Sequence, residues 1–191
     1  MMNIFWIILS YFIGNISGSL ILGKLLYQED IRKKGSGNAG TTNAVRIYGM
    51  KFGIMTFVID FLKGLFIGLL GKYLGGNLIF WMSLAVVLGH NFPLFFKFKG
   101  GKGIATSFGV LIVLSPGFIL ILLGIFLLLV FKTRLMSLGS IVASIIAFGY
   151  GIYLYPHDYY RSLTFMVLAI LALFRHHSNI RRLLQGKENT F

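Results

Sequence analysis

Long apolar runs separated by short polar stretches make up most of the chain. A helix needs about 20 apolar residues to cross a hydrocarbon core about 30 Å thick. Runs with few charges occupy residues 4–26, 52–74, 77–96, 139–155 and 163–174. The first run lacks a basic segment before it and a small-residue cleavage site, so we interpret it as a retained helix. The pattern predicts an all-α, polytopic membrane bundle formed by a single domain over residues 1–191.

Residues 104–131 are ambiguous, because these 28 residues would make one helix about 42 Å long. Ser115-Pro116-Gly117 lies in the middle and is typical of a turn. A turn there gives seven spans and places Lys72 and Arg161 on one side, with Lys63 inside a span. The other side then holds 15 cations: Lys24, Arg32, Lys33, Lys34, Arg46, Lys51, Lys97, Lys99, Lys102, Lys132, Arg134, Arg175, Arg181, Arg182 and Lys187.

The distribution of cations decides between the two topologies. A single crossing of 104–131 would divide the cations only 10 to 7. Cytoplasmic loops carry the excess of Lys and Arg, so we predict seven spans, with the N-terminus outside and the C-terminus cytoplasmic. Residues 104–114 would cover only roughly 16 Å. We therefore expect a half-helix or a re-entrant segment there if they do not fully span.

The composition agrees with a membrane protein and removes several chemistries. Hydrophobic residues make up 57% and charged residues 12% of the chain, and the mean hydropathy is +0.83. A soluble domain is about 25% charged. The absence of Cys excludes disulfides, thiolate metal sites and Cys nucleophiles. Five acidic residues and a net charge of +13 argue against a carboxylate-rich Mg²⁺ site. We expect a bilayer partner, but no cofactor, metal, nucleic acid or obligate protein partner.

The first of three polar stretches covers residues 32–46, on the predicted cytoplasmic side. Its glycines allow the backbone to turn several N–H groups toward one point. Ser, Thr and Asn side chains add donors, and Arg46 adds a two-pronged guanidinium. These are the parts of an anion site, although a flexible loop with ordinary positive-inside charges is the alternative.

The second stretch, residues 89–106, contains His90 and a basic, glycine-rich turn. A turn of this kind at the start of a helix directs free N–H groups and the helix dipole at an anion, and Lys102 adds a point charge. It is not a Walker A loop, because Phe96 stands at the first Gly position and Gly103 replaces the required Ser or Thr. A nucleoside triphosphatase is therefore disfavoured. A basic loop that contacts anionic headgroups is the alternative.

The third stretch, residues 175–182, contains two adjacent histidines. Adjacent helical residues point about 100° apart, so the pair is poorly suited to a metal. His177 is better suited to carry a proton or to donate to a phosphate, and an interfacial basic helix end is the alternative.

Within the second apolar run, Asp60 and Lys63 can neutralise each other at i, i+3. We interpret them as a structural ion pair, with participation in the site as the alternative.

Three cationic stretches at a membrane face suggest a substrate that carries a phosphate and an acyl chain. A soluble-type glycerolipid acyltransferase carries His-x₄-Asp, whereas the fifth residue after His90 is Phe95. A CDP-alcohol phosphotransferase needs several Asp on one helix, and Asp60 stands alone in its run. A serine hydrolase triad lacks an Asp partner. A membrane transporter of organic phosphate anions and a non-catalytic lipid-binding scaffold remain as alternatives.

The polar motifs occur in a specific order. They are Ser36-Gly37-Asn38-x-Gly40-x-Thr42-Asn43 with Arg46, Asp60-x-x-Lys63-Gly64, Gly89-His90-x-x-Pro93, Phe98-Lys99-Gly100-Gly101-Lys102-Gly103, and Arg175-His176-x-x-Asn179-Ile180. In this combination the chain resembles the bacterial acyl-phosphate:glycerol-3-phosphate acyltransferase family, the PlsY type, over most of its length. The resemblance implies an integral enzyme of the bacterial cytoplasmic (inner) membrane, with its active site on the cytoplasmic face. It also implies acyl transfer from acyl phosphate to position 1 of glycerol 3-phosphate, giving lysophosphatidic acid and phosphate for phospholipid synthesis.

The resemblance assigns roles to particular residues. Those expected to be catalytic are Ser36, Arg46, Lys102, His177 and Asn179. Those expected to bind substrate or its phosphates are Gly37, Asn38, Gly40, Thr41, Thr42, Asn43, His90, Lys99, Gly100, Gly101, Gly103 and His176. The proton acceptor is either His177 or the substrate's own phosphate. The acyl chain is expected to lie between helices, open to the bilayer.

Overall fold

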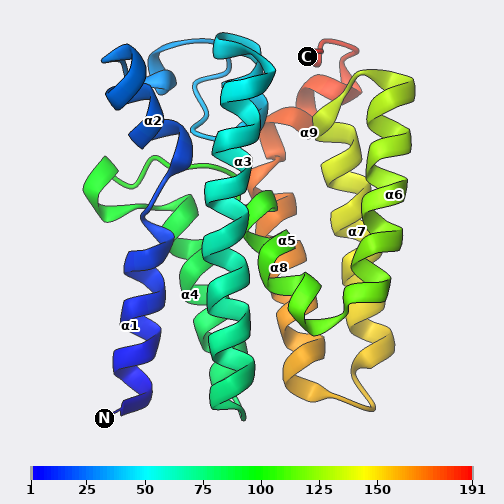
Figure 1. Ribbon diagram of the computed structural model, residues 1–191. Helices are drawn as coiled ribbons and strands as arrows, with labels where there is room; N and C mark the ends of the chain where they lie inside the picture. The colour runs from blue at the N-terminus through cyan, green and yellow to red at the C-terminus, as the bar shows by residue number, and fades with distance from the viewer. Residues whose placement is uncertain (1, 191) are drawn as a thin grey trace.

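The computed structural model describes residues 2–190, which form an upright bundle of helices with no strand among them. The two ends of the chain lie at opposite ends of the bundle (Figure 1). The helices are α1 Met2–Gly14, α2 Gly18–Tyr27, η1 Ile31–Lys33, α3 Thr41–Leu74, α4 Leu78–Asn91, η2 Leu94–Phe96, α5 Ile104–Leu114, α6 Pro116–Thr133, α7 Met136–Leu154, α8 Tyr159–Arg175 and α9 His177–Leu184. The predicted all-α class is confirmed.

The helix lengths support a polytopic membrane bundle. Within residues 2–190, 4 helices are long and apolar enough to cross a membrane, or up to 6 if each bent pair counts as one span. The bent pairs are α1 with α2, at 42°, and α8 with α9, at 59°. The shorter apolar helix α5 would be the seventh span. The count of seven and the orientation of the termini remain predictions.

The predicted turn within residues 104–131 is confirmed. Helix α5 ends at Leu114 and α6 begins at Pro116, with Ser115 between them in a non-helical conformation. Proline at the first position of a helix is favoured because its missing N–H would have no intrahelical partner there. In Figure 1, α5 begins partway down the bundle and descends, and α6 then rises along its outer side. The glycine-rich turn before α5 therefore lies inside the bundle, partway along its length.

Helices α3 and α5 pack closely because glycines remove side chains from their interface. A Cβ atom at Gly64 would overlap the carbonyl of Thr106, and a Cβ atom at Gly109 would overlap the carbonyl of Phe61. Small residues at such contacts allow helix backbones to approach in lipid, where packing replaces the hydrophobic driving force. Helix α3 also bends at Gly49, which has φ +83. Its first two turns therefore take a different direction from the rest.

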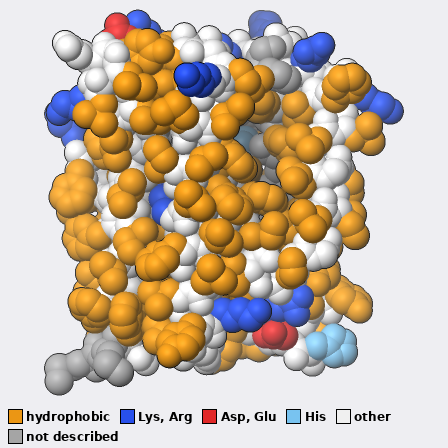
Figure 2. All heavy atoms as spheres, in the orientation of Figure 1, with side chains coloured by type: hydrophobic (Ala, Val, Ile, Leu, Met, Phe, Trp, Pro, Cys, Tyr) orange, Lys and Arg blue, Asp and Glu red, His pale blue; other side chains and the backbone are white. Residues whose placement is uncertain are grey.

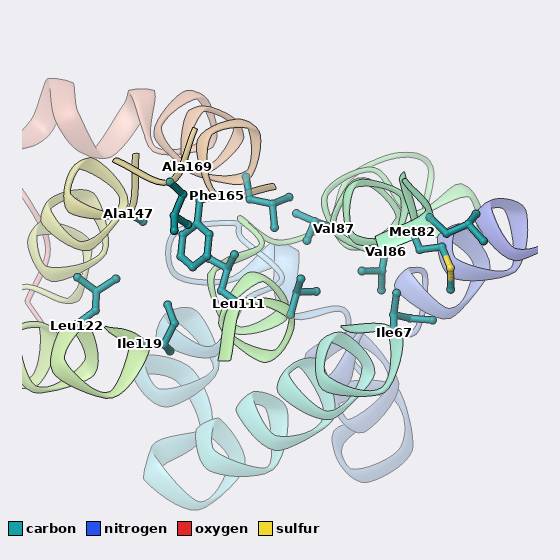
Figure 3. Packing of buried hydrophobic residues seen from close by; sticks show 14 residues of the cluster. Ile67, Met82, Val86, Val87, Leu111, Ile119, Leu122, Ala147, Phe165 and Ala169 are labelled. Atoms are coloured by element: carbon teal, nitrogen blue, oxygen red, sulfur yellow. The ribbon is translucent and has the colours of Figure 1, made fainter. Parts of the chain in front are cut away.

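The surface and the core are both apolar. Figure 2 shows hydrophobic side chains over most of one flank, with Lys and Arg side chains gathered mainly toward the two ends. Exposed positions include Phe131 at 78% and Ile121 at 67%, as expected for side chains that face lipid. The core cluster joins α3, α4 and α5 to α6, α7 and α8, and Figure 3 shows Phe165 next to Leu111 within it.

Candidate active site

A cavity of about 440 Å³ lies between α3, α5, α6, α7, α8 and the C-terminal segment. Its polar end contains Arg46, Lys102, Asn179 and Arg182. The rest of its wall is apolar and includes Ile104, Phe108, Leu111, Ile119, Leu122, Phe126, Ala143, Ala147, Leu168 and Ala172. A site of this shape suits a ligand with one anionic end and a long apolar tail.

Direct hydrogen bonds join the three polar stretches. The Arg32 guanidinium donates to the carbonyls of Phe96 and Lys99 at 2.7 and 2.9 Å, which ties the first stretch to the second. The Arg175 guanidinium donates to the carbonyl of Gly101 at 2.9 Å, which ties the third stretch to the second. Segments far apart in sequence thereby form one polar surface.

The first stretch is held by Asn43, near the start of α3. Its Oδ1 accepts a 2.9 Å hydrogen bond from the Ser36 N–H, and its Nδ2 donates to the carbonyls of Ile31 and Lys34. The Asn43 side chain is therefore occupied by the loop backbone and positions Ser36, rather than offering free donors to a ligand. Helix α3 begins at Thr41, beside the cavity, so its first N–H groups and its dipole favour an anion there.

The sequence of the glycine-rich turn suggests that its backbone N–H groups bind an anion, and the structure differs from this expectation. The N–H groups of Gly100 and Gly101 donate to the carbonyls of Asn91 and His90 at 3.1 and 3.2 Å. A Cβ atom at Gly101 would overlap Nε2 of His90. These two glycines therefore allow the turn to pack on the end of α4. The residue with positive φ in the turn is Gly103, at +85°, where α5 begins.

Lys102 follows the turn and reaches the third stretch. Its ammonium donates to Oδ1 of Asn179 at 2.6 Å. Burial lowers the pKa of the Lys102 ammonium from its usual value to about 8; Glu188 raises it, and Arg182, Arg175 and Arg46 lower it further. The ammonium is thus a partly desolvated charge among other cations. Such a group gains more from a bound anion than an exposed lysine does.

The bend between α8 and α9 separates the two histidines. His176 is buried and lines the cavity, and its Nδ1 donates to the carbonyl of Ala172 at 2.8 Å. The other ring nitrogen of a neutral His176 is therefore a proton acceptor. His177 is exposed, its Nδ1 faces the carbonyl of Phe174 at 3.0 Å, and it does not line the cavity. The structure brings His176, and not His177, to the other polar residues.

Asp60 and Lys63 form a buried ion pair beside the cavity. The Lys63 ammonium lies 2.8 Å from Oδ1 of Asp60, and the two side chains are 4% and 1% exposed. The same ammonium donates to the carbonyls of Gly14 and Ile16, where α1 ends, and to Nδ1 of His90 at 2.8 Å. Lys63 thereby provides a hydrogen-bond donor for the carbonyl groups at the break between α1 and α2, and it orients the imidazole of His90.

The cavity gathers most of the residues expected from sequence. Lining it are Ser36, Asn38, Gly40, Thr41, Thr42, Asn43, Arg46, His90, Lys102, Gly103, His176 and Asn179. Gly37, Lys99, Gly100, Gly101 and His177 lie outside the lining. The described part of the chain holds no cluster of His, Cys, Asp and Glu that could bind a metal ion.

Three residues of the C-terminal segment were not expected. Arg182, Glu188 and Asn189 line the polar end, and Arg46 donates to the carbonyl of Thr190 at 3.1 Å. One signal was available in the sequence, because Glu188 is a lone acid that follows a helix-ending glycine, Gly186, in a basic segment. The reversal of the chain at that glycine was needed to place the acid in the site.

Comparison with known proteins gives one consistent result. The profile of the glycerol-3-phosphate acyltransferase family matches residues 4–186. A glycerol-3-phosphate acyltransferase from Finegoldia magna is 51% identical over 183 residues, covering 95% of this chain and 92% of that one. One from Thermoanaerobacter pseudethanolicus is 45% identical, with the same coverage of 95% and 92%.

Solved structures agree with this result. The crystal structure of PlsY, an integral membrane glycerol 3-phosphate acyltransferase, in its glycerol 3-phosphate form superposes with a TM-score of 0.90 at 39% identity. It covers 100% of this chain and 96% of the PlsY chain. The profile match, the identities and the superposition extend over nearly the whole bundle. This chain belongs to the glycerol-3-phosphate acyltransferase family.

Proposed function

We propose that this membrane acyltransferase moves a fatty acyl group from acyl phosphate to position 1 of glycerol 3-phosphate, releasing lysophosphatidic acid and inorganic phosphate. The observation that carries the proposal is one cavity whose cationic end, around Arg46 and Lys102, continues into an apolar wall. PlsY has been solved in the glycerol 3-phosphate form described above and also in a lysophosphatidic acid form, which supports the acceptor and the product. Acyl phosphate as the donor is our inference from the cationic end and from the sequence motifs.

The two phosphate groups belong at the polar end. The first N–H groups of α3 and α5, with Ser36, Arg46 and Lys102, supply donors and positive charge on three sides of it. The acyl chain follows the wall formed by Phe108, Leu111 and Leu122 and by other apolar residues of α5 to α8. Binding in this way fixes both reacting groups, which removes much of the entropic part of the barrier.

The chemistry requires no covalent enzyme intermediate. The primary hydroxyl oxygen of glycerol 3-phosphate attacks the acyl carbonyl carbon, and the carbonyl oxygen becomes an oxyanion. The bond from that carbon to the phosphate oxygen then breaks, and phosphate leaves with the electron pair as the carbonyl re-forms. Lys102 and Asn179, bonded to each other at 2.6 Å, are placed to stabilise the oxyanion and to orient the attacking hydroxyl.

The hydroxyl proton needs an acceptor, and two candidates fit the cavity. His176 lines the cavity and has a ring nitrogen that is free to accept a proton. A substrate phosphate is the second candidate, because it can take the proton directly. His177, the candidate from sequence, would need to rotate from the exposed surface into the cavity, so we assign the role of base to His176 or to the phosphate.

The proposal is tested with purified protein in detergent or nanodiscs. Acyl phosphate and glycerol 3-phosphate should together yield lysophosphatidic acid and phosphate in equal amounts. Acyl-CoA should not replace acyl phosphate, because the chain lacks the His-x₄-Asp motif of soluble-type glycerolipid acyltransferases. Comparable turnover with acyl-CoA would refute the proposed donor. Flux of organic phosphate across sealed vesicles without any acyl transfer would instead favour a transporter.

We further propose that the polar end faces the cytoplasm of a bacterial inner membrane, which the distribution of cations supports.

A further inference from the structure

A second cavity of about 440 Å³ lies at the end of the bundle opposite the polar end of the first. It is formed where α3 and α5 end and where α4 and α8 begin, toward the lower end of Figure 1. The wall residues that decide its chemistry are Lys72, Gly75, Gly76, Leu114, Asp158 and Arg161. Lys72 and Arg161 are also the two cations that the predicted topology separates from the other 15, and the acyl-transfer site uses neither.

The Arg161 side chain is held in the wall of this cavity by two hydroxyl groups. Its Nε donates to Oγ of Ser115 at 3.0 Å, and its Nη2 donates to the same Oγ and to the Tyr150 hydroxyl. These neutral partners fix the guanidinium without compensating its charge. Nη1 has no hydrogen-bond partner among the described residues, so part of the guanidinium remains available to a ligand.

The charge of the cavity is positive and is not cancelled by an ion pair. Within residues 2–190, neither Lys72 nor Arg161 belongs to an ion pair. Asp158 also lies in the wall, where its Oδ1 accepts the backbone N–H of Arg161 at 3.1 Å and caps α8. Two cations and one carboxylate leave one positive charge in excess, so the wall favours an anion.

The backbone between α3 and α4 adds donors to the same wall. Gly75 and Gly76 have φ +74 and +59, and a Cβ atom at either would meet nothing within 4 Å, so the turn is open. Helix α4 begins at Leu78, and the side chain of Asn77 does not cap it. The first N–H groups of α4 therefore have no partner within the helix, and the positive end of its dipole adds to the cationic wall, which Ile79 also lines.

The surroundings of the cavity favour a lipid over a soluble anion. Leu114 and Ile79 give the wall an apolar part beside the cations. Tyr73, which follows Lys72, is 86% exposed, and Tyr159, at the start of α8, is 52% exposed. Exposed tyrosines are typical of the level of the lipid headgroups. A phosphate bound at that level leaves its acyl chains along the apolar flank that Figure 2 shows.

We propose that this cavity binds an anionic phospholipid of the leaflet opposite the polar end, with the headgroup phosphate between Lys72 and Arg161. Basic cavities between membrane helices bind anionic headgroups through the same groups. The bound lipid joins the ends of α3, α5 and α8, and it stabilises the bundle because a ligand of the folded state shifts the folding equilibrium. The site lies apart from the acyl-transfer cavity and does not depend on its reaction.

Quenching of tryptophan fluorescence by brominated lipids tests the site. Trp81 lies in the first turn of α4, two residues after Ile79, and Trp6→Phe leaves it as the single tryptophan of the chain. In phosphatidylcholine bilayers, brominated phosphatidylglycerol should bind beside Trp81 about fivefold more strongly than brominated phosphatidylcholine, as expected for one excess positive charge. Lys72→Gln, alone and together with Arg161→Gln, should bring this ratio toward one.

Lys132→Gln in the same Trp6→Phe background is the matched control. Lys132 is an exposed cation at the end of α6 and lies outside both cavities, so its loss should leave the ratio unchanged. Phosphatidylglycerol should also raise the melting temperature of the detergent-purified wild type more than phosphatidylcholine does, and the double variant should lose this difference.

Several outcomes would overturn the proposal. A ratio near one in the starting protein would show that the cavity has no preference for an anionic lipid. Equal losses in Lys72→Gln and Lys132→Gln would indicate diffuse attraction to the whole surface. Inorganic phosphate that raises the melting temperature as much as phosphatidylglycerol does, at matched ionic strength, would identify a site for a soluble anion.

The test remains decisive if the double variant does not fold. Lys72 is exposed, so Lys72→Gln and Lys72→Glu should fold, and an unchanged ratio in both would refute the proposal. A protein without acyltransferase activity that keeps the lipid preference would refute the proposed function and leave this site in place.

Discussion

The Lys102 ammonium donates a 2.6 Å hydrogen bond to Oδ1 of Asn179, which joins the loop before α5 to α9 across 77 residues of sequence. Both groups line the cavity, and neither lies within one of the long apolar helices. The polar end of the cavity is therefore formed by loops and helix ends at one end of the bundle. The apolar helices supply the rest of its wall.

The first prediction is a loss of activity at alkaline pH. Because the pKa of the Lys102 ammonium is lowered to about 8, the group is charged below that pH and becomes neutral above it. An uncharged amine attracts phosphate less, so kcat/KM should fall as the pH rises through about 8. Lys102→Arg should remove this limb, because a guanidinium stays charged, while lowering kcat through its different shape. The same limb in Lys102→Arg as in the wild type would assign the titration to another group.

The second prediction separates the two histidines. His176→Ala should lower kcat by about 100-fold if the ring accepts the hydroxyl proton. His177→Ala should remain within about twofold of the wild type, because that ring is exposed and lies outside the cavity. Single-turnover rates on folded variants would measure both. The reverse order would reinstate His177, and two near-normal rates would leave the substrate phosphate as the proton acceptor.

The third prediction concerns Gly101. An added methyl group would overlap Nε2 of His90, so Gly101→Ala should displace the imidazole and the turn that carries Lys102. We expect a higher KM for glycerol 3-phosphate and a loss of about 1–3 kcal/mol of stability from overpacking. Gly149→Ala is the control, because a Cβ atom there would have nothing within 4 Å. A normal KM for Gly101→Ala would show that the turn can shift without affecting the site.

The fourth prediction concerns the length of the acyl chain. Ala147 is 4% exposed and lines the cavity wall on α7. Ala147→Phe should fill part of the wall and lower kcat/KM for palmitoyl phosphate by about tenfold or more, while shorter acyl phosphates are affected less. Ile145→Phe provides the control on the same helix, since Ile145 is 56% exposed. Equal losses for every chain length would show that the tail does not reach Ala147.

The fifth prediction tests the topology. The chain has no Cys, so single cysteines can be introduced without removing native ones. Gly117→Cys, beside the turn between α5 and α6, should react with a membrane-impermeant maleimide from the outside. Gln185→Cys, at the end of α9, should react only after the inner face is opened. Labelling of both positions from the same side would refute the odd number of crossings predicted between residues 117 and 185.

The sequence predicted the architecture because membrane helices follow a simple physical rule. Apolar runs long enough to cross a bilayer must form helices, since lipid offers no partner for free backbone groups. The turn at Ser115 and Pro116 followed from local backbone chemistry and is observed. The short helix α5 was anticipated as well, because its 11 residues are too few for an ordinary span.

Most of the polar end could also be predicted, because anion binding needs recognisable groups. Glycines, small donors and basic residues identified the three stretches before any contact was known. The sequence could not decide whether each of these side chains points into the cavity or away from it. One residue separates His176 from His177, and the bend of 59° between α8 and α9 determines which ring enters the cavity.

Only the tertiary structure decided how the backbone groups are used. The N–H groups of Gly100 and Gly101 are bonded to the end of α4, and the Asn43 amide is bonded to its own loop, so these groups are occupied before any substrate binds. Glu188 enters the site because a left-handed turn at Gly186 reverses the chain. A sequence motif specifies which donors and charges are available. Which donor pairs with which acceptor depends on the distances between segments, and these distances are determined by tertiary packing. The order of the motifs along the chain was therefore enough to indicate the family, whereas the fold was needed to show which residues contact each other.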